Sequence, residues 1–401
     1  MPQNRSVIVV GAGIYGVSAA LALQQRGYLV SLCDPGPLPH PNAASTDISK
    51  VIRMDYGADE LYLQMMEDAF EGWDRWNREW PTALYHQTGF VIMARQPMRP
   101  GTYEYESYRL LQQHGHNPQH LDAQALRRRF PAWNADAYAE GYFNPRAGWA
   151  ESGRVVERLL LLAMAQGVRR YDGLQFARLL ESGGRVQGII GDDGAILTSD
   201  FVVMCAGAWT PTLLPHLTDV LWATAQPVLH FKVDDLALFQ PPKFTVWAAD
   251  IANTGWYGFP ALDDGTLKLA NHGPGRRVHP DEPRIADLHA EDKFRTFLQH
   301  TFPQAAAAPL LRTRLCLYCD SWDGNLWIDH DPEHPGLIVC AGDSGHAFKF
   351  APILGELIAD VLERRSNPFA ARFAWRARGR LDHEDARFVG GTADQTETPA
   401  S

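Results

Sequence analysis

Residues 6–34, "SVIVVGAGIYGVSAALALQQRGYLVSLCD", decide the expected fold of this chain. Residues 6–10 form a short run rich in β-branched side chains, which indicates a strand. Residues 14–25 have the apolar spacing of a helix, and Gly27 is a plausible stop for that helix. The next residues, "YLVSLCD" (28–34), indicate a second strand. A strand, a glycine turn, a helix and another strand in this order predict an α/β fold of the Rossmann-like type.

The first turn carries Gly11, Gly13 and Gly16 in the pattern GxGxxG. Gly11 permits the tight turn, Gly13 lets the backbone approach a pyrophosphate, and Gly16 lets the helix pack against the strand. The helix N-terminus adds free N–H groups and a dipole that favours an anion. Asp34, 18 residues after Gly16, is placed to accept hydrogen bonds from a ribose diol. These features predict dinucleotide binding, with a ligand-free glycine turn as the alternative.

The glycine motif alone does not separate NAD from FAD. Residues 336–362, "GLIVCAGDSGHAFKFAPILGELIADVL", give a second strand, a turn with Gly342 and Gly345, and a second helix. A helix N-terminus there can face the pyrimidine edge of an isoalloxazine ring, where negative charge builds up on reduction. This segment therefore favours FAD.

The remaining pattern indicates two domains whose segments alternate along the chain. We expect the dinucleotide-binding domain to comprise residues 1–82, 150–225 and 321–386. Residues 83–149 and 226–320 contain strand-like runs such as "GFVIMA" and "TLKLANH", which predict a β-rich substrate domain. Residues 387–401, "RFVGGTADQTETPAS", are polar and expected to be disordered.

Composition narrows the class of protein. The chain has 401 residues and a net charge of −10, from 37 basic and 47 acidic side chains, with no long basic run. Nucleic acid is therefore not an expected partner. Five scattered cysteines do not suggest a disulfide framework. The sequence shows no signal-peptide pattern and no apolar run of about 18 residues, so we expect a soluble, cytoplasmic protein.

Several sequence blocks, in order, resemble one family of flavoproteins. They are the GxGxxG start, "DISKVIRMDYG" (47–57), "VVMCAGAW" (202–209), "WYGFPALDDGTLKLANH" (256–272), "RLCLYC" (314–319) and "GDSGHAFKF" (342–350). The chain is similar to the glycine oxidase/D-amino-acid oxidase class, and within it to the monomeric sarcosine oxidase group. That group includes N-methyltryptophan, pipecolate, saccharopine and fructosyl-amino-acid oxidases. The resemblance implies a GR2-type FAD-binding domain joined to a catalytic domain.

"RLCLYC" places Cys316 and Cys319 three residues apart. The resemblance implies that Cys316 holds the flavin covalently, as a thioether to its 8α-methyl group, and that Cys319 stands where relatives often have threonine. Two inert buried cysteines are the alternative. A structural zinc site would need a second pair of ligands, and a redox pair would be expected at a helix N-terminus. The histidines of "HDPEH" (330–334) read as part of a turn, so no metal is expected.

The resemblance also implies roles for four cations. Arg53 and Lys349 match positions that clamp the substrate carboxylate, where arginine offers a fork of donors and lysine a point charge. An ordinary surface charge is the alternative for both residues. Lys268 matches a lysine that supports oxygen activation by stabilising developing superoxide. A surface lysine is the alternative, although Leu267 and Leu269 would point to the opposite side of the strand. Lys50 is a further candidate catalytic residue, and it stands where monomeric sarcosine oxidase has arginine. A lysine in "DxxKxxR" is more similar to fructosyl-amino-acid, saccharopine or pipecolate oxidases, which argues against sarcosine itself as the substrate.

Other side chains are expected to shape the pocket. Tyr257 and Tyr318 match active-site tyrosines of the group, and His272 matches a histidine near the flavin. His346 is expected beside the flavin. A structural histidine with satisfied hydrogen bonds is the alternative for His272, and a role in the structure of the turn is the alternative for His346.

These observations favour an FAD-dependent oxidase of a secondary amine or imino acid that bears a carboxylate. Its expected partners are this small molecule and O2, and the products are an imine and H2O2. A monomer is expected. The alternatives are a flavin dehydrogenase with another electron acceptor, a flavin- or nucleotide-binding protein without turnover, and an NAD-linked dehydrogenase. The identity of the amine does not follow from the spacing of these residues.

Overall fold

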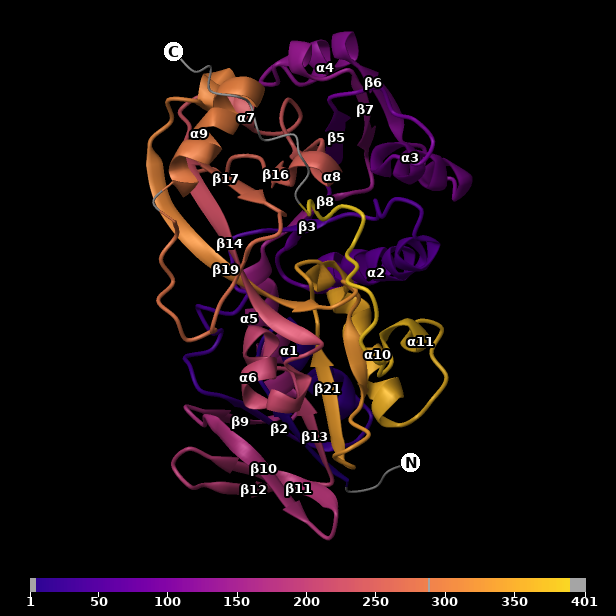
Figure 1. Cartoon of the computed structure of the whole chain (residues 1–401), viewed down its shortest axis with the longest axis vertical. Helices are drawn as coiled ribbons and strands as arrows, with labels where there is room; N and C mark the ends of the chain where they lie inside the picture. The colour runs from indigo at the N-terminus through magenta and orange to yellow at the C-terminus, as the bar shows by residue number, and fades with distance from the viewer. Residues whose placement is uncertain (1–4, 288, 390–401) are drawn as a thin grey trace.

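The computed structural model describes residues 5–287 and 289–389. Its lower half in Figure 1 is built on a six-stranded sheet in the order β20–β21–β13–β1–β2–β9. All neighbours are parallel except β20 and β21. The strands are β1 (Ser6–Val10), β2 (Leu29–Asp34), β9 (Arg169–Asp172), β13 (Phe201–Met204), β20 (Trp327–His330) and β21 (Leu337–Ala341). The predicted α/β fold is thus confirmed.

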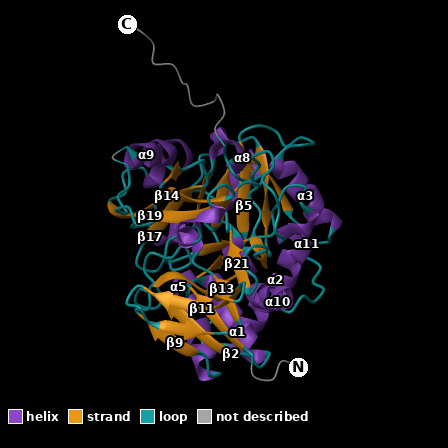
Figure 2. Cartoon of the chain, turned by 60° about the horizontal axis from the view of Figure 1, so that its bottom comes forward, coloured by secondary structure: helices purple, strands orange, loops and turns teal. Residues whose placement is uncertain are grey.

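Both faces of this sheet are covered, because successive strand residues point to opposite sides. Val7 and Val9 of β1 lie in the hydrophobic core that includes helices α1 (Ile14–Gln25), α5 (Ser152–Ala165) and α10 (Ala351–Leu362). Ile8 and Val10 lie in a second core beneath a small sheet, β10–β11–β12, which lies next to β13 (Figure 2). Its strands are β10 (Phe176–Ser182), β11 (Arg185–Gly191) and β12 (Ile196–Thr198). Burial on both faces accounts for the nearly continuous apolar sequence of β1.

The upper half contains a nine-stranded, mostly antiparallel sheet in the order β18–β14–β17–β16–β15–β5–β7–β6, with β19 paired to β14 (Figure 1). The strands are β5 (Phe90–Ala94), β6 (Gln119–Asp122), β7 (Glu140–Asn144), β14 (Leu221–Lys232), β15 (Val246–Ala249), β16 (Trp256–Gly258), β17 (Thr266–Asn271), β18 (Arg276–Arg277) and β19 (Leu310–Ser321). A third core, rich in aromatic side chains, packs on it. The strands of both large sheets follow the two-domain division expected above, apart from β14 and β19, which cross its boundaries, and we keep that division as a proposal.

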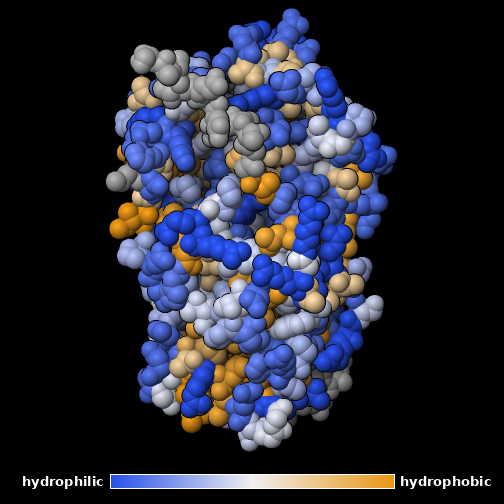
Figure 3. Space-filling model, viewed as in Figure 1, coloured by the Kyte–Doolittle hydropathy of each residue, from blue (hydrophilic) through white to orange (hydrophobic). Residues whose placement is uncertain are grey.

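Shorter elements join these halves. A small sheet is formed by β3 (Lys50–Ile52), β8 (Gly148–Ala150) and β4 (Tyr85–His86). The remaining α-helices are α2 (Glu60–Glu79), α3 (Tyr103–Gln113), α4 (Ala123–Arg129), α6 (Thr210–Leu213), α7 (Leu236–Phe239), α8 (Ile251–Thr254), α9 (Ala290–Thr301) and α11 (Ala370–Phe373). None of the helices in the described part of the chain combines the length and apolarity needed to cross a membrane. The face in Figure 3 is mostly hydrophilic, with hydrophobic residues in scattered groups.

Residues 374–389 follow α11 and contain no helix or strand. Arg376 binds Asp323, with 2.6 Å between Nε and Oδ2. Arg387 binds Asp320 at 3.0 Å and is only 8% exposed. The expectation of disorder from residue 387 onward therefore does not hold at Arg387, because this ion pair fixes it. Residues 390–401 of the expected tail lie outside the described residues.

Candidate functional site

A cavity of about 610 Å³ opens where the ends of β1, β2 and β13 meet the residues after β21. Gly11, Gly13 and Asp34 line it on one side, and Asp343 and Gly345 line it on the other. Two segments more than 300 residues apart thus form one cavity because β1, β13 and β21 are neighbours in the same sheet. Its size fits a large organic ligand.

Glycine is required by geometry at two positions of the motif. Gly11 has φ +97°, and a Cβ atom there would lie 2.5 Å from the carbonyl oxygen of Cys205. A Cβ atom on Gly16 would lie 1.8 Å from the carbonyl oxygen of Gly11, so this glycine permits the close helix–strand packing. Gly13 is less confined and precedes α1, where the N–H of Ile14 donates to Ser45 Oγ at 3.1 Å. The backbone therefore forms the cradle that a pyrophosphate needs.

Asp34 lies at the end of β2 and is nearly buried. Its Oδ2 accepts the N–H of Ala12 at 2.9 Å, and its Oδ1 accepts the N–H of Gly36 at 3.1 Å. Burial raises the pKa of Asp34, while these two hydrogen bonds oppose the shift. A carboxylate oxygen can accept more than one hydrogen bond, so the arrangement remains compatible with a ribose diol.

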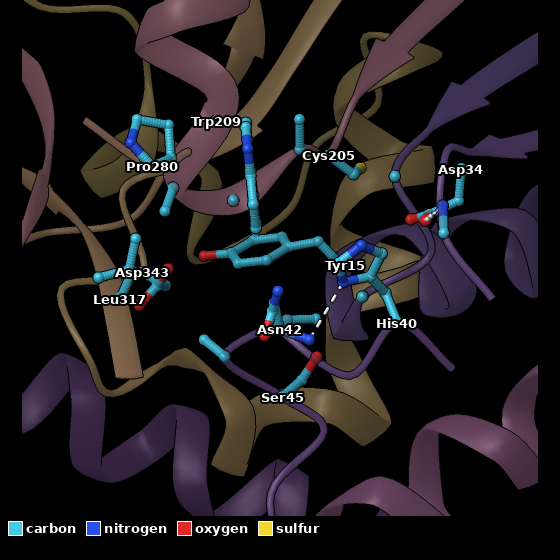
Figure 4. Close-up of a pocket in the computed structure, with 18 of the residues that line it drawn as sticks. Tyr15, Asp34, His40, Asn42, Ser45, Cys205, Trp209, Pro280, Leu317 and Asp343 are labelled. Carbon is cyan, nitrogen blue, oxygen red and sulfur yellow. Dashed lines mark hydrogen bonds between the residues drawn. The ribbon is translucent and has the colours of Figure 1, made fainter. Parts of the chain in front are cut away.

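The sequence interpretation missed several residues of this cavity. The ring of Tyr15 extends between Trp209 and Asn42 in Figure 4, while Ser45 and Asp343 lie around it. Tyr15, Trp209 and Asp343 fall within blocks already singled out, so their position beside the glycines was an available signal. Asn42 and Ser45 belong to a proline-rich loop whose sequence carries no comparable signal. Burial raises the pKa of Asp343 to about 6.

A second, smaller cavity of about 60 Å³ adjoins the first. Lys50, Tyr318 and Gly345 line both cavities, so they mark where the two meet. A Cβ atom on Gly345 would lie 2.4 Å from the ring of Tyr318, which explains a glycine there. The structure brings most of the expected site residues to the smaller cavity: Lys50, Arg53, Tyr257, His272, Tyr318, Gly345, His346 and Lys349. Gly16, Lys268, Cys316 and Gly342 line neither cavity.

Lys268 is buried in β17, with Leu267 and Leu269 in the hydrophobic core on the other face. Its Nζ lies 2.6 Å from Asp47 Oδ2 and donates to the carbonyl oxygen of Ser49 at 2.6 Å. The alternative of a surface lysine is therefore wrong. Burial lowers the pKa of Lys268 to about 8, although Asp47 favours the charged form. Its Nζ also lies 4.5 Å from the ring centre of Phe259, which lines the smaller cavity.

Lys349 begins a chain of polar contacts at the smaller cavity. Its Nζ donates to Tyr56 Oη at 2.7 Å, and Tyr56 Oη lies 3.1 Å from His346 Nδ1. His346 Nε2 lies 2.9 Å from the carbonyl oxygen of Gly324, which can only accept, so Nε2 carries the proton and Nδ1 accepts from Tyr56. Burial lowers the pKa of His346 to about 4, which agrees with this neutral form. Lys349 keeps further N–H donors for a ligand.

Arg53 is buried, and each of its terminal nitrogens already has a partner. Nη1 donates to Tyr103 Oη at 2.9 Å, and Nη2 donates to Glu384 Oε1 at 2.6 Å. The other oxygen of Glu384 lies 3.3 Å from His272 Nε2. Burial lowers the pKa of His272. Glu384 was missed because no motif or spacing marks it in the sequence.

The two cysteines of "RLCLYC" lie on β19 and face opposite sides, as residues three apart on a strand must. Cys316 packs with Tyr318, Tyr257 and Val228. Cys319 instead packs in the second core, the one that contains Ile8 and Val10 of β1. Neither is in a disulfide. A redox pair or a shared metal site is therefore incompatible with the fold, while a separate role for Cys316 is not.

One cluster in the described part of the chain could hold a metal ion by its residue types: His216, Asp331 and His334. His216 Nε2 lies 2.7 Å from Asp331 Oδ2, and His334 Nδ1 lies 3.2 Å from the same oxygen. Two ligands on one tetrahedral zinc, each about 2.0–2.1 Å from it, would be about 3.3 Å apart. The shorter distance is that of a hydrogen bond, so His216 and Asp331 satisfy each other without a metal.

A glycine cradle between parallel strands, a second strand–turn segment and an adjoining cation-lined cavity indicate a dinucleotide-binding protein with an anion-binding site beside the dinucleotide. The chain belongs to the DAO family, described as FAD dependent oxidoreductase, whose match covers residues 6–361. The residues present fit FAD. A Cβ atom on Gly11 or Gly16 would clash with backbone carbonyl oxygens, so the glycine turn keeps its close form, and this turn opens into the larger cavity.

Individual proteins of known name are also similar to this chain. A monomeric sarcosine oxidase from Bacillus sp. (strain B-0618) is 27% identical over 366 residues, which cover 90% of this chain and 93% of that protein. An N-methyl-L-tryptophan oxidase from Salmonella enteritidis PT4 is 28% identical over 371 residues, covering 90% and 96%. The crystal structure of fructosyl amine:oxygen oxidoreductase (Amadoriase I) from Aspergillus fumigatus matches with a TM-score of 0.81 and 27% identity, covering 97% of this chain and 94% of the other.

Proposed function

We propose that this protein is a flavoprotein oxidase of a secondary amine or imino acid that carries a carboxylate. One observation supports it most: a small cavity lined by Lys50, Arg53 and Lys349 joins the nucleotide cavity at Tyr318 and Gly345. Cations suit a carboxylate, and the junction suits the reacting carbon. The names of the relatives, oxidases of N-methylated and fructosylated amines, agree with this substrate class.

FAD bound in the larger cavity would accept two electrons from the amine and pass them to O2, giving an imine and H2O2. The residues of the chain would bind the cofactor and the substrate, orient them, and supply positive charge to the site. Gly11, Gly13, Gly16 and Asp34 would hold the dinucleotide, and Gly342, Gly345 and His346 would shape its far end. Lys349 and Arg53 would bind the carboxylate, with Tyr318 orienting it.

Four side chains are assigned to the reaction itself. Lys268 would supply positive charge for oxygen reduction from behind Phe259. Tyr257, His272 and Lys50 would orient the amine in the smaller cavity, which all three line. Burial raises the pKa of Tyr257, so its phenol stays protonated at neutral pH and can donate a hydrogen bond.

The experiment that tests the function measures the visible flavin spectrum of the purified protein during anaerobic addition of N-methyl and cyclic amino acids. Bleaching by one of them, followed by H2O2 release in air, is the expected result. Bleaching without H2O2 in air would favour a dehydrogenase. No bleaching by any member of the class would contradict the proposal. A monomer in the cytoplasm remains our expectation, which gel filtration and cell fractionation would check.

We further propose that Cys316 holds FAD covalently. Acid-precipitated wild-type protein is expected to keep its yellow colour in the pellet, and Cys316→Ala is expected to release it. Cys319→Ala is the matched control, because Cys319 faces the opposite side of β19, and it should retain the colour. A colourless wild-type pellet would contradict covalent attachment while leaving FAD binding intact.

A further inference from the structure

The chain supplies its own carboxylate to the cavity in which we expect the substrate carboxylate. Glu384 lies on residues 374–389, and its side chain is only 4% exposed. Its two oxygens contact Arg53 and His272, and it lines the smaller cavity. Burial alone would raise the pKa of Glu384, but surrounding groups, including Arg53, hold it well below the usual range. The side chain is therefore an anion at neutral pH.

Glu384 pairs with the positive charge of Arg53, which a substrate carboxylate would also need. Arg53 and Lys349 lie over the same ring of Tyr56, at 5.0 and 4.7 Å from its centre. Arg53 donates through Nη1 to Tyr103 and through Nη2 to Glu384. A paired, bidentate contact between Arg53 and an incoming carboxylate needs two parallel donors. Glu384 takes an N–H of Nη2 and neutralises the guanidinium charge, so an incoming carboxylate must compete with Glu384 for Arg53.

The backbone around Glu384 is fixed on both sides. Arg376 pairs with Asp323 before it, and Arg387 pairs with Asp320 after it. The N–H of Phe388 also donates to the carbonyl oxygen of His272 at 3.0 Å. An exchange of partners at Arg53 therefore requires rotation of the Glu384 side chain rather than opening of the whole segment.

The volume of the smaller cavity also indicates that the Glu384 side chain must move before a substrate can bind. Its volume of about 60 Å³ is well below the roughly 300 Å³ at the lower end of small-molecule sites. Glu384 is one of the residues that limit it. Moving this side chain off Arg53 would free both space and a cation.

We propose that Glu384 occupies the carboxylate position on Arg53 in the free enzyme and that the substrate carboxylate displaces it. This inference rests on the proposed function, since it takes Arg53 and Lys349 as the carboxylate site. Glu384 is then a specificity-determining residue, because it makes every carboxylate ligand compete with an internal one. Ligands without a carboxylate leave the Arg53–Glu384 pair intact and have no such competition.

The test is calorimetric titration of the flavin-loaded enzyme with acetate, which needs no turnover. In Glu384→Gln, which keeps the shape and removes the charge, acetate is expected to bind about five- to tenfold more tightly than in wild type. Acetamide, the uncharged analogue, is expected to bind equally to both. Asp385→Asn is the matched control, since it removes the adjacent, exposed carboxylate and should leave acetate binding unchanged.

A second arm keeps the test decisive if the variant is less stable. The effect of Glu384→Gln on acetate is expected to disappear when Arg53→Met is also present, and Glu384→Ala should reproduce the tightening. Unchanged or weaker acetate binding in both folded Glu384 variants would overturn the proposal. Tighter acetate binding in an enzyme that oxidises no amine would instead overturn the proposed function alone.

Discussion

Replacing Lys268 with methionine is expected to slow the reoxidation of reduced flavin by O2 about ten- to hundredfold, with flavin reduction by the substrate retained. That loss corresponds to about 1.4–2.7 kcal/mol. Lys268 is a fully enclosed cation behind Phe259, and a unit charge a few ångströms away contributes about 2–4 kcal/mol at an effective dielectric constant near 20. Asp47, 2.6 Å from Nζ, cancels part of this field, so we expect a loss in the lower part of that range.

The measurement is stopped-flow reoxidation of substrate-reduced enzyme mixed with air-saturated buffer. Lys293→Met is the control, because Lys293 is exposed on α9 and should leave the rate unchanged. Equal reoxidation rates in wild type and Lys268→Met would remove Lys268 from the mechanism.

The same lysine is expected to give flavin reoxidation a pH dependence. The pKa of Lys268 is lowered to about 8, and the side chain is charged below that value. Reoxidation is therefore expected to be fast below pH 8 and to fall as the pH rises through 8. In Lys268→Met this dependence should be absent.

Replacing Lys349 with methionine is expected to lower kcat/KM for a carboxylate-bearing amine about 10- to 150-fold, mainly by raising KM. A hydrogen bond to a charged group contributes about 1.5–3 kcal/mol, which gives this range. Lys349 is suited to the contact because Tyr56 uses only one of its N–H donors. The loss should be small for an amine of similar shape without a carboxylate, and this comparison is the internal control.

The pKa of Lys349 determines the direction in which KM should change with pH. Burial, together with repulsion from Arg53, lowers its pKa well below the usual range. A carboxylate binds the charged form, so KM is expected to rise as the pH rises through this pKa. Steady-state rates of wild type and Lys349→Met across pH provide the measurement. A kcat/KM within twofold of wild type would show that Lys349 does not bind the substrate.

The nucleotide-binding half of the fold could be predicted because its signals are local. Strand β1, the glycine turn and helix α1 are consecutive, and both the required φ at Gly11 and the helical spacing of residues 14–25 depend on near neighbours. Strand periodicity also determined that Cys316 and Cys319 face opposite sides once β19 was a strand. Family resemblance added the positions of the cations, most of which the structure brings to one cavity.

Only the tertiary structure decided how the charges of the site are paired. Asp47 meets Lys268 across more than 200 residues, and Arg53 meets Glu384 across 331. No spacing in the sequence encodes such pairs, because they depend on how two sheets and the segment after α11 pack together. A motif identifies the type of a cationic residue and the strand on which it lies. Whether that residue is available to a ligand depends on which distant anion the folded chain places beside it.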